Sequence, residues 1–294
     1  MPGEAGRRLE SGSFSSGLSV PDFAACLAMG LRPVGLVQGF CAMQWGWYGA
    51  GSPYLRGLSP YAAPGASRGL YVEHYGCPHG FVSAEHRPWG QNYEQPWIEE
   101  AWAQGFGSAY DRMVEEASGA GAHGVIGVTD SVRHLADASV TEFHLMGTAV
   151  VVEGGPPPAH GRPWTTYLAG QRLAKLFEAG FVPVSIAAVL TSVRIWANCV
   201  TEYLMEGGMY SWGGYGPHEI DQVAKAHMTA VALSREKVRA QLHGDTLHGA
   251  RLDTVRREIG AGDGVVECTL AGTRVRRFKA FDPVVPAKPT VRLT

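Results

Sequence analysis

The residue types that bind transition metals gather in one short stretch of the chain. His74, Cys77 and His79 fall within six residues, and His86 follows seven positions later. Imidazole and thiolate are the ligands that a borderline-soft divalent ion such as zinc prefers. The pattern therefore predicts a transition-metal site. The alternative is a polar, aromatic-rich surface loop at a subunit interface, since Cys77-Pro-His79 is too tight for a standard zinc finger and no second cysteine pair completes it.

A second group could perform acid–base chemistry or bind a ligand. If the hairpin between residues 124 and 153 turns about residue 137, Asp130 lies across from His144, and His123 marks the start of the same strand. A carboxylate opposite an imidazole can ligate a metal or act as an acid–base pair. The alternative is an ordinary cross-strand contact on an exposed sheet face.

Common catalytic signatures are absent from the sequence. It contains no Gly-x-Ser-x-Gly elbow, phosphate loop, His-Glu-x-x-His motif or dinucleotide fingerprint. An active site would therefore have to be a composite of residues distant in sequence. The pattern favours a protein that is not an enzyme.

The chain carries an internal repeat, which is the strongest signal for its architecture. Gly30 and Pro33 recur as Gly180 and Pro183, at a spacing of 150. At a spacing of 125, Gly147-Thr148 recurs as Gly272-Thr273, and His123-Gly124 is matched with His248-Gly249. The sequence therefore predicts two copies of one fold.

Each copy is predicted to contain a short helix, a strand, a loop, a long helix and a hairpin. Ser19 is the expected cap of the first short helix, and Thr165 or Thr166 that of its counterpart. Glycines at positions 30 and 180 end these helices. In the first copy we expect the strand at 31–47, the helix at 97–118 and the hairpin at 124–135 and 140–153; in the second, the strand at 181–200, the helix at 218–242 and the hairpin at 251–259 and 265–278.

The repeat and the composition also predict domain boundaries. A first domain covers 17–153 and includes a Gly, Pro, Tyr and Trp-rich loop at 46–96; a Pro/Gly linker covers 154–163, and a second domain covers 164–279. Flexible tails are expected at 1–16 and 280–294.

Composition narrows the expected partners and compartment. The net charge of −2 gives no reason to expect nucleic acid or an anionic membrane as partner. Five cysteines, an odd number, favour a reducing compartment. No uninterrupted apolar run reaches the roughly 18 residues of a membrane span. We therefore expect a cytoplasmic protein.

These elements predict an α+β fold, in which helices cover one face of an antiparallel sheet. The other face of each sheet would be bare. Such a face is usually buried by another copy, so the sequence predicts a homo-oligomer.

The segment Tyr110–Val128, followed by Gly147-Thr-Ala-Val150, resembles the YbjQ family of small bacterial proteins, which are catalogued as heavy-metal-binding. The family shows an Ala/Glu-rich helix, a Gly-Ala-x-(Ala/Gly)-Val-(Val/Ile)-Gly-Val strand and a later Gly-Thr-Ala-Val strand. The second copy has diverged to Gly272-Thr-Arg-Val275. The resemblance implies an α+β domain that assembles into a ring, typically of five single-domain subunits. It brings no catalytic residues.

Three hypotheses follow. The first is a non-enzymatic, ring-forming binding or scaffold protein built from two YbjQ-like domains, with an unknown small ligand or protein partner. The second adds a divalent metal in the loop that carries His74, Cys77, His79 and His86. The third is an enzyme with an inter-subunit pocket built on Asp130, His144 and His123.

Overall fold

The computed structural model describes residues 15–44, 90–135, 140–156, 161–205, 219–260 and 263–279. In these ranges the chain forms two four-stranded sheets and five helices, an α+β architecture as predicted. The first sheet has the strand order β1 (Leu31–Gln44), β4 (Val140–Val152), β3 (Gly124–Leu135), β5 (Trp164–Thr165). The second has the order β2 (Asn92–Glu94), β6 (Phe181–Ile195), β8 (Asp263–Arg277), β7 (Thr246–Gly260). None of the helices in this part of the chain has both the length and the apolar character needed to cross a membrane.

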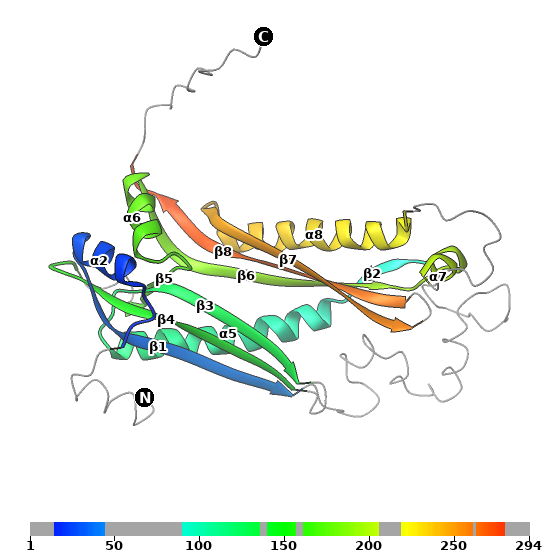
Figure 1. Ribbon diagram of the computed structural model, residues 1–294, viewed down its shortest axis with the longest axis horizontal. Helices are drawn as coiled ribbons and strands as arrows, with labels where there is room; N and C mark the ends of the chain where they lie inside the picture. The colour runs from blue at the N-terminus through cyan, green and yellow to red at the C-terminus, as the bar shows by residue number, and fades with distance from the viewer. Residues whose placement is uncertain are drawn as a thin grey trace, which may run out of the picture.

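Apart from the additional helix α7 (Cys199–Met205) in the second, the two repeats have the same order of elements (Figure 1). The first consists of α2 (Val20–Ala28), β1 (Leu31–Gln44), α5 (Pro96–Gly119), β3 (Gly124–Leu135) and β4 (Val140–Val152). The second consists of α6 (Gly170–Glu178), β6 (Phe181–Ile195), α7 (Cys199–Met205), α8 (Asp221–Leu242), β7 (Thr246–Gly260) and β8 (Asp263–Arg277). The strand predicted to continue to residue 200 ends at Ile195, and α7 begins at Cys199.

Local sequence explains the ends of the short helices. The Ser19 hydroxyl accepts a hydrogen bond from the Asp22 amide, which caps α2 as predicted. The glycine after each short helix, Gly30 or Gly180, has a positive φ, a conformation that glycine adopts without strain. The predicted threonine cap of α6 is wrong: Ala169 holds that position, because the hydroxyls of Thr165 and Thr166 bond to backbone amides elsewhere.

Each hairpin contains a β-bulge, and the positions of the two bulges correct the predicted sequence match between the hairpins. In the first sheet the pairing of β3 with β4 shifts between Ile126 and Thr129, around Gly127 at φ 59°. In the second it shifts around Gly249 at φ 63°. Gly249 therefore corresponds to Gly127 and not to Gly124, so the match of His123-Gly124 with His248-Gly249 is wrong by three residues. The match of Gly147-Thr148 with Gly272-Thr273 agrees with the observed pairing.

The repeats exchange short strands. β2 (Asn92–Glu94) precedes α5 in the first repeat but pairs with β6 of the second sheet. β5 (Trp164–Thr165) precedes α6 in the second repeat but pairs in parallel with β3 of the first sheet. Hydrogen bonds therefore cross the predicted domain linker in both directions, and the two repeats share one packed junction.

The layers follow the order first sheet, α5, second sheet, α8 (Figure 1). Helix α5 packs on β1 and β4 with one side and on β6 with another, so one apolar cluster joins both sheets. The outer face of the first sheet, carrying Gln38, Phe40 and Ala42, is exposed as predicted. The bare face expected for the second sheet is instead covered along β6 by α5.

Candidate functional site

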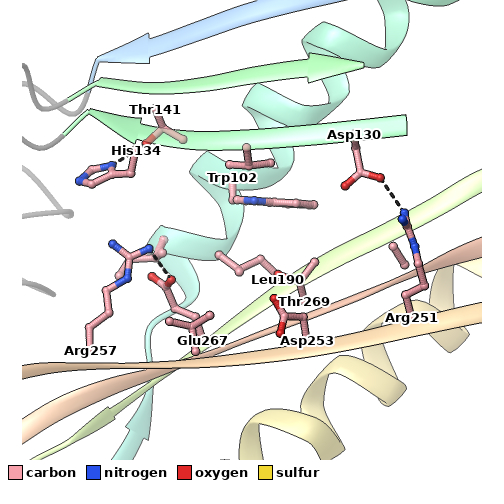
Figure 2. Close-up of a pocket in the computed structure, with 14 residues that line it drawn as sticks. Trp102, Asp130, His134, Thr141, Leu190, Arg251, Asp253, Arg257, Glu267 and Thr269 are labelled. Carbon is pink, nitrogen blue, oxygen red and sulfur yellow. Dashed lines mark hydrogen bonds and ion pairs between the residues drawn. The ribbon is translucent and has the colours of Figure 1, made fainter. Parts of the chain in front are cut away.

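A cavity of about 450 Å³ opens between the two repeats (Figure 2). One wall is the inner side of the β3–β4 hairpin, and the other is the facing side of β7 and β8. Residues of α5 and β6, namely Ile98, Trp102 and Leu190, form its apolar back. We call this cavity the inter-repeat cleft. Its volume lies in the range of small-molecule sites.

An ion pair between the two sheets closes one end of the cleft. The Arg251 guanidinium on β7 lies 2.7 Å from the Asp130 carboxylate on β3. The same guanidinium lies 4.4 Å from the centre of the Tyr167 ring, a cation–π contact. Burial raises the pKa of the Tyr167 phenol above its usual range, so it stays neutral at physiological pH. Arg251 therefore contacts both Asp130, as an ion pair, and Tyr167, as a cation–π contact.

The other end carries a second ion pair and a histidine. Arg257 lies 2.9 Å from Glu267 across the second sheet. Opposite them, His134 Nδ1 lies 3.0 Å from the Thr141 hydroxyl. Burial and the nearby Arg257 charge lower the pKa of His134, against the opposing effect of Glu267. His134 is therefore mainly neutral at pH 7.

Asp253 lies on the cleft floor between the two ion pairs (Figure 2). It pairs with Thr269 in the sheet register, two residues from Arg251 along the same face of β7. Within the described part of the chain, no hydrogen bond or ion pair engages its carboxylate. The charged groups of the cleft therefore leave one carboxylate without a counter-charge.

Helix α5 is fixed beneath the second sheet by buried polar contacts. The Ser192 amide donates to Glu99 at 2.8 Å, and the Ser192 hydroxyl donates to Gln95 at 3.0 Å. Burial raises the pKa of the Glu99 carboxyl, and the ion pair with Lys237 of α8 opposes that shift. Because these contacts hold the first turns of α5, Trp102 keeps its place at the back of the cleft.

The structure does not bring Asp130, His144 and His123 together. The observed register places Ser131 opposite His144 and Leu145 opposite Asp130. A one-residue slip reverses the face of a strand, so Asp130 lines the cleft while His144 lies on the outer face near Phe40. His123 accepts a hydrogen bond from the Val152 amide at the far end of the hairpin. The predicted Asp–His pairing is therefore wrong.

The predicted metal ligands His74, Cys77, His79 and His86 lie outside the described residues. Among the residues that the structure does describe, no group of three or more His, Cys, Asp or Glu side chains could hold a metal ion.

Most of the cleft residues were not identified from the sequence. Arg251, Asp253 and Arg257 alternate along β7, and Asp130 and His134 lie four residues apart on β3. Alternating charges on a strand usually mark a solvated face, so this pattern alone did not indicate a site. Only the packing of one repeat against the other places these two sets of residues on facing walls of one cleft.

Comparisons with known proteins give one informative match. No protein-family model matches the chain, and no solved structure matches it. The chain is 24% identical over 281 residues to "Encapsulin nanocompartment protein Rv1762c" of Mycobacterium tuberculosis, an alignment that covers 94% of this chain and 90% of that protein. An alignment of this length spans both repeats.

Proposed function

We propose that this chain is an assembly protein, which associates head to tail with copies of itself by repeating the contact between its own two repeats. One observation carries the proposal. Helix α5 of the first repeat covers one face of the second sheet, while among the described residues no helix covers the equivalent face of the first sheet, and the equivalent side of α8 is only half-buried. A second copy would supply each with its missing partner.

The two sheet faces correspond residue by residue. Phe40 pairs with His144 in the first sheet as Leu190 pairs with Thr269 in the second. Leu190 is 9% exposed because α5 covers it, whereas Phe40 is 47% exposed. The large apolar side chain at this position is therefore buried within the chain in one repeat and open in the other.

The two long helices correspond in the same way. Gly105, Ala109 and Met113 of α5 face its own sheet, as Ala230, Ser234 and Val238 of α8 do at a spacing of 125.

The second side of α5 contacts the other sheet. It carries Ile98, Trp102 and Phe106, all buried. The corresponding side of α8 carries Val223, His227 and Val231, which are only half-buried.

The segments before the short helices repeat as well. The Tyr167 amide donates to the Thr273 hydroxyl at 3.1 Å, and the Gly17 amide donates to the equivalent Thr148 hydroxyl at 3.2 Å. Just before Tyr167, Thr165 pairs with β3 of the preceding repeat. Ser15 corresponds to Thr165 at the repeat spacing of 150. In a head-to-tail assembly, Ser15 would pair with β7 of the preceding copy as Thr165 pairs with β3.

Two further points support the proposal. The Mycobacterium tuberculosis relative is named as a protein of an encapsulin nanocompartment, an assembled structure. The resemblance to the YbjQ family implies ring-forming domains. A head-to-tail contact gives a ring when its rotation closes and a filament when it does not. Because every chain brings two repeats, a closed ring contains an even number of repeats, and a pentamer of chains would contain ten.

Light scattering coupled to size-exclusion chromatography tests the proposal. We expect wild-type protein to elute as an oligomer and the Phe40→Asp variant to elute as a monomer, since a charge on the outer face prevents docking of α8. Val200→Asp introduces the same charge at an exposed residue of α7, which belongs to neither of the two contact surfaces, and as the matched control it should assemble normally. A monomeric wild type, or assembly of Phe40→Asp, would contradict the proposal.

The metal hypothesis stays a separate proposal. A loop with His74, Cys77, His79 and His86 has the donor chemistry for zinc. Elemental analysis of untagged protein tests it: bound metal that is lost in a Cys77→Ala/His79→Ala variant supports the site, and protein without metal argues against it.

A further inference from the structure

We propose that the inter-repeat cleft binds a small organic cation, a primary amine carried on an apolar body. All the residues that line the cleft belong to one chain, so the inference does not depend on the proposed assembly. It rests on the charge that the cleft leaves unpaired and on the surface that surrounds that charge.

The charges of the cleft select a cation. Its lining holds three carboxylates and two guanidiniums. Asp130 and Glu267 are each matched by an arginine, Arg251 at 2.7 Å and Arg257 at 2.9 Å. Asp253 remains, so the cleft carries one uncompensated negative charge beside a mainly neutral His134. An ammonium group would supply the positive charge that pairs with the third carboxylate.

The same arrangement disfavours an anion. Arg251 is held by Asp130 and by the face of the Tyr167 ring. Arg257 is held by Glu267. An anionic ligand would share an arginine that already has a carboxylate partner, and it would also meet the charge of Asp253. A cation instead adds a partner to a carboxylate that has none among the described residues.

The walls around Asp253 favour an apolar body on the cation. Trp102, Ile98 and Leu190 form the back of the cleft, and Val132 and Val255 lie on its two sides. Val132 is 41% and Val255 46% exposed, so these side chains present apolar surface that a ligand can cover. Trp102 is 7% exposed and stacks on Phe106, so it contributes to the apolar back as a fixed part of the core. A cavity of about 450 Å³ accommodates a compact amine with an aromatic or aliphatic body.

Isothermal titration calorimetry with three related probes tests the inference. The probes are 2-phenylethylamine, the neutral 2-phenylethanol and the anionic 3-phenylpropionate. We expect the wild-type protein to bind the amine about tenfold more tightly than the alcohol, because only the amine can form an ion pair with Asp253. The anion should bind most weakly.

Asp253→Asn removes the charge and keeps the shape of the side chain. In this variant the preference for the amine over the alcohol should disappear, while binding of the alcohol is unchanged. Glu115→Gln removes an exposed carboxylate on α5 that does not line the cleft, and it should bind like wild type. No binding of the amine to wild-type protein, or an equal preference for the amine in Asp253→Asn, would overturn the inference. Neither result depends on whether the protein is a monomer or an oligomer.

Discussion

Phe40 and Leu190 hold the same position in the two repeats, 150 residues apart, but α5 covers only Leu190. Because only one of the two side chains is covered, we expect substitutions at the two positions to affect different properties. Leu190→Asp should destabilise the fold by about 3 kcal/mol, because it places a charge in the core that joins the sheets. Phe40→Asp should change the free energy of unfolding by less than about 1 kcal/mol while abolishing assembly. Urea denaturation at a protein concentration low enough to dissociate the oligomer measures the first quantity, and light scattering measures the second.

The pair also separates two explanations of the exposed phenylalanine. If Phe40 served only the fold, both variants would lose stability to a similar degree. If it serves assembly, stability and oligomeric state respond to different residues. A strongly destabilised Phe40→Asp monomer would contradict the second explanation.

Helix α5 lies directly on β1 at Gly39, which gives a second prediction. A Cβ atom at this position would lie 1.8 Å from the Ala109 carbonyl oxygen, so Gly39→Ala must push α5 away from the first sheet. We expect a loss of about 2 kcal/mol or more, seen as a lower Tm. At Gly35, in the same strand, such a Cβ would meet no atom of the described residues within 4 Å, and Gly35→Ala should therefore leave the Tm nearly unchanged. Equal Tm values for the two variants would contradict the observed packing.

The buried carboxyl of Glu99 gives a third prediction, for the dependence of stability on pH. Burial raises the pKa of Glu99, so its ionised form destabilises the folded state above that pKa, and the penalty disappears as the pH falls toward the unfolded value of about 4.3. Lys237 offsets part of this penalty. Because the ammonium is about one-third exposed, Lys237→Met should cost about 2 kcal/mol at pH 8, and less at pH 5.

The double variant Glu99→Gln/Lys237→Met is the control for this effect, because it removes the buried carboxylate that loses its partner in the single variant. Glu94, the other partner of Lys237, is about one-third exposed and is present in both variants. Its stability relative to wild type should vary less between pH 5 and 8. Chemical denaturation at both pH values measures the difference. An equal loss at both pH values in Lys237→Met would show that Glu99 is not the group responsible.

Much of the fold could be predicted from the sequence because its signals are local or repeated. The Ser19 cap, the positive-φ glycines at 30 and 180 and the long helices depend on neighbours in the chain. The register of the first hairpin was wrong because four residues, 136–139, separate the strands, and the centre of symmetry falls after residue 137. That half-residue error moved Asp130 to the wrong face.

The cleft could not be predicted by the same reasoning. Trp102, Asp130 and Asp253 come from three elements in two repeats, and no pattern within one repeat relates them. The strand exchange that draws the repeats together depends on β2 and β5, which are three and two residues long. Segments this short carry almost no periodic signal, so the junction appears only in the folded chain.

Protonation of His134 provides a fourth prediction, for ligand binding. The pKa of His134 lies below its ordinary value of about 6.5, so the imidazole is neutral at pH 7.5 and gains charge only in more acidic solution. The charged groups near it are Arg257, which favours the neutral form, and Glu267, which favours the charged form. A second cation in the cleft would repel a bound ammonium group. The affinity for 2-phenylethylamine should therefore fall between about pH 7.5 and about pH 5, and calorimetry across this range measures the change.

The control variant His134→Gln keeps a polar side chain that cannot be protonated. It should flatten the dependence of amine affinity on pH, while 2-phenylethanol should bind equally well to the wild type at both pH values. A wild-type pH profile that His134→Gln leaves unaltered would assign the titration to another group and remove His134 from the site.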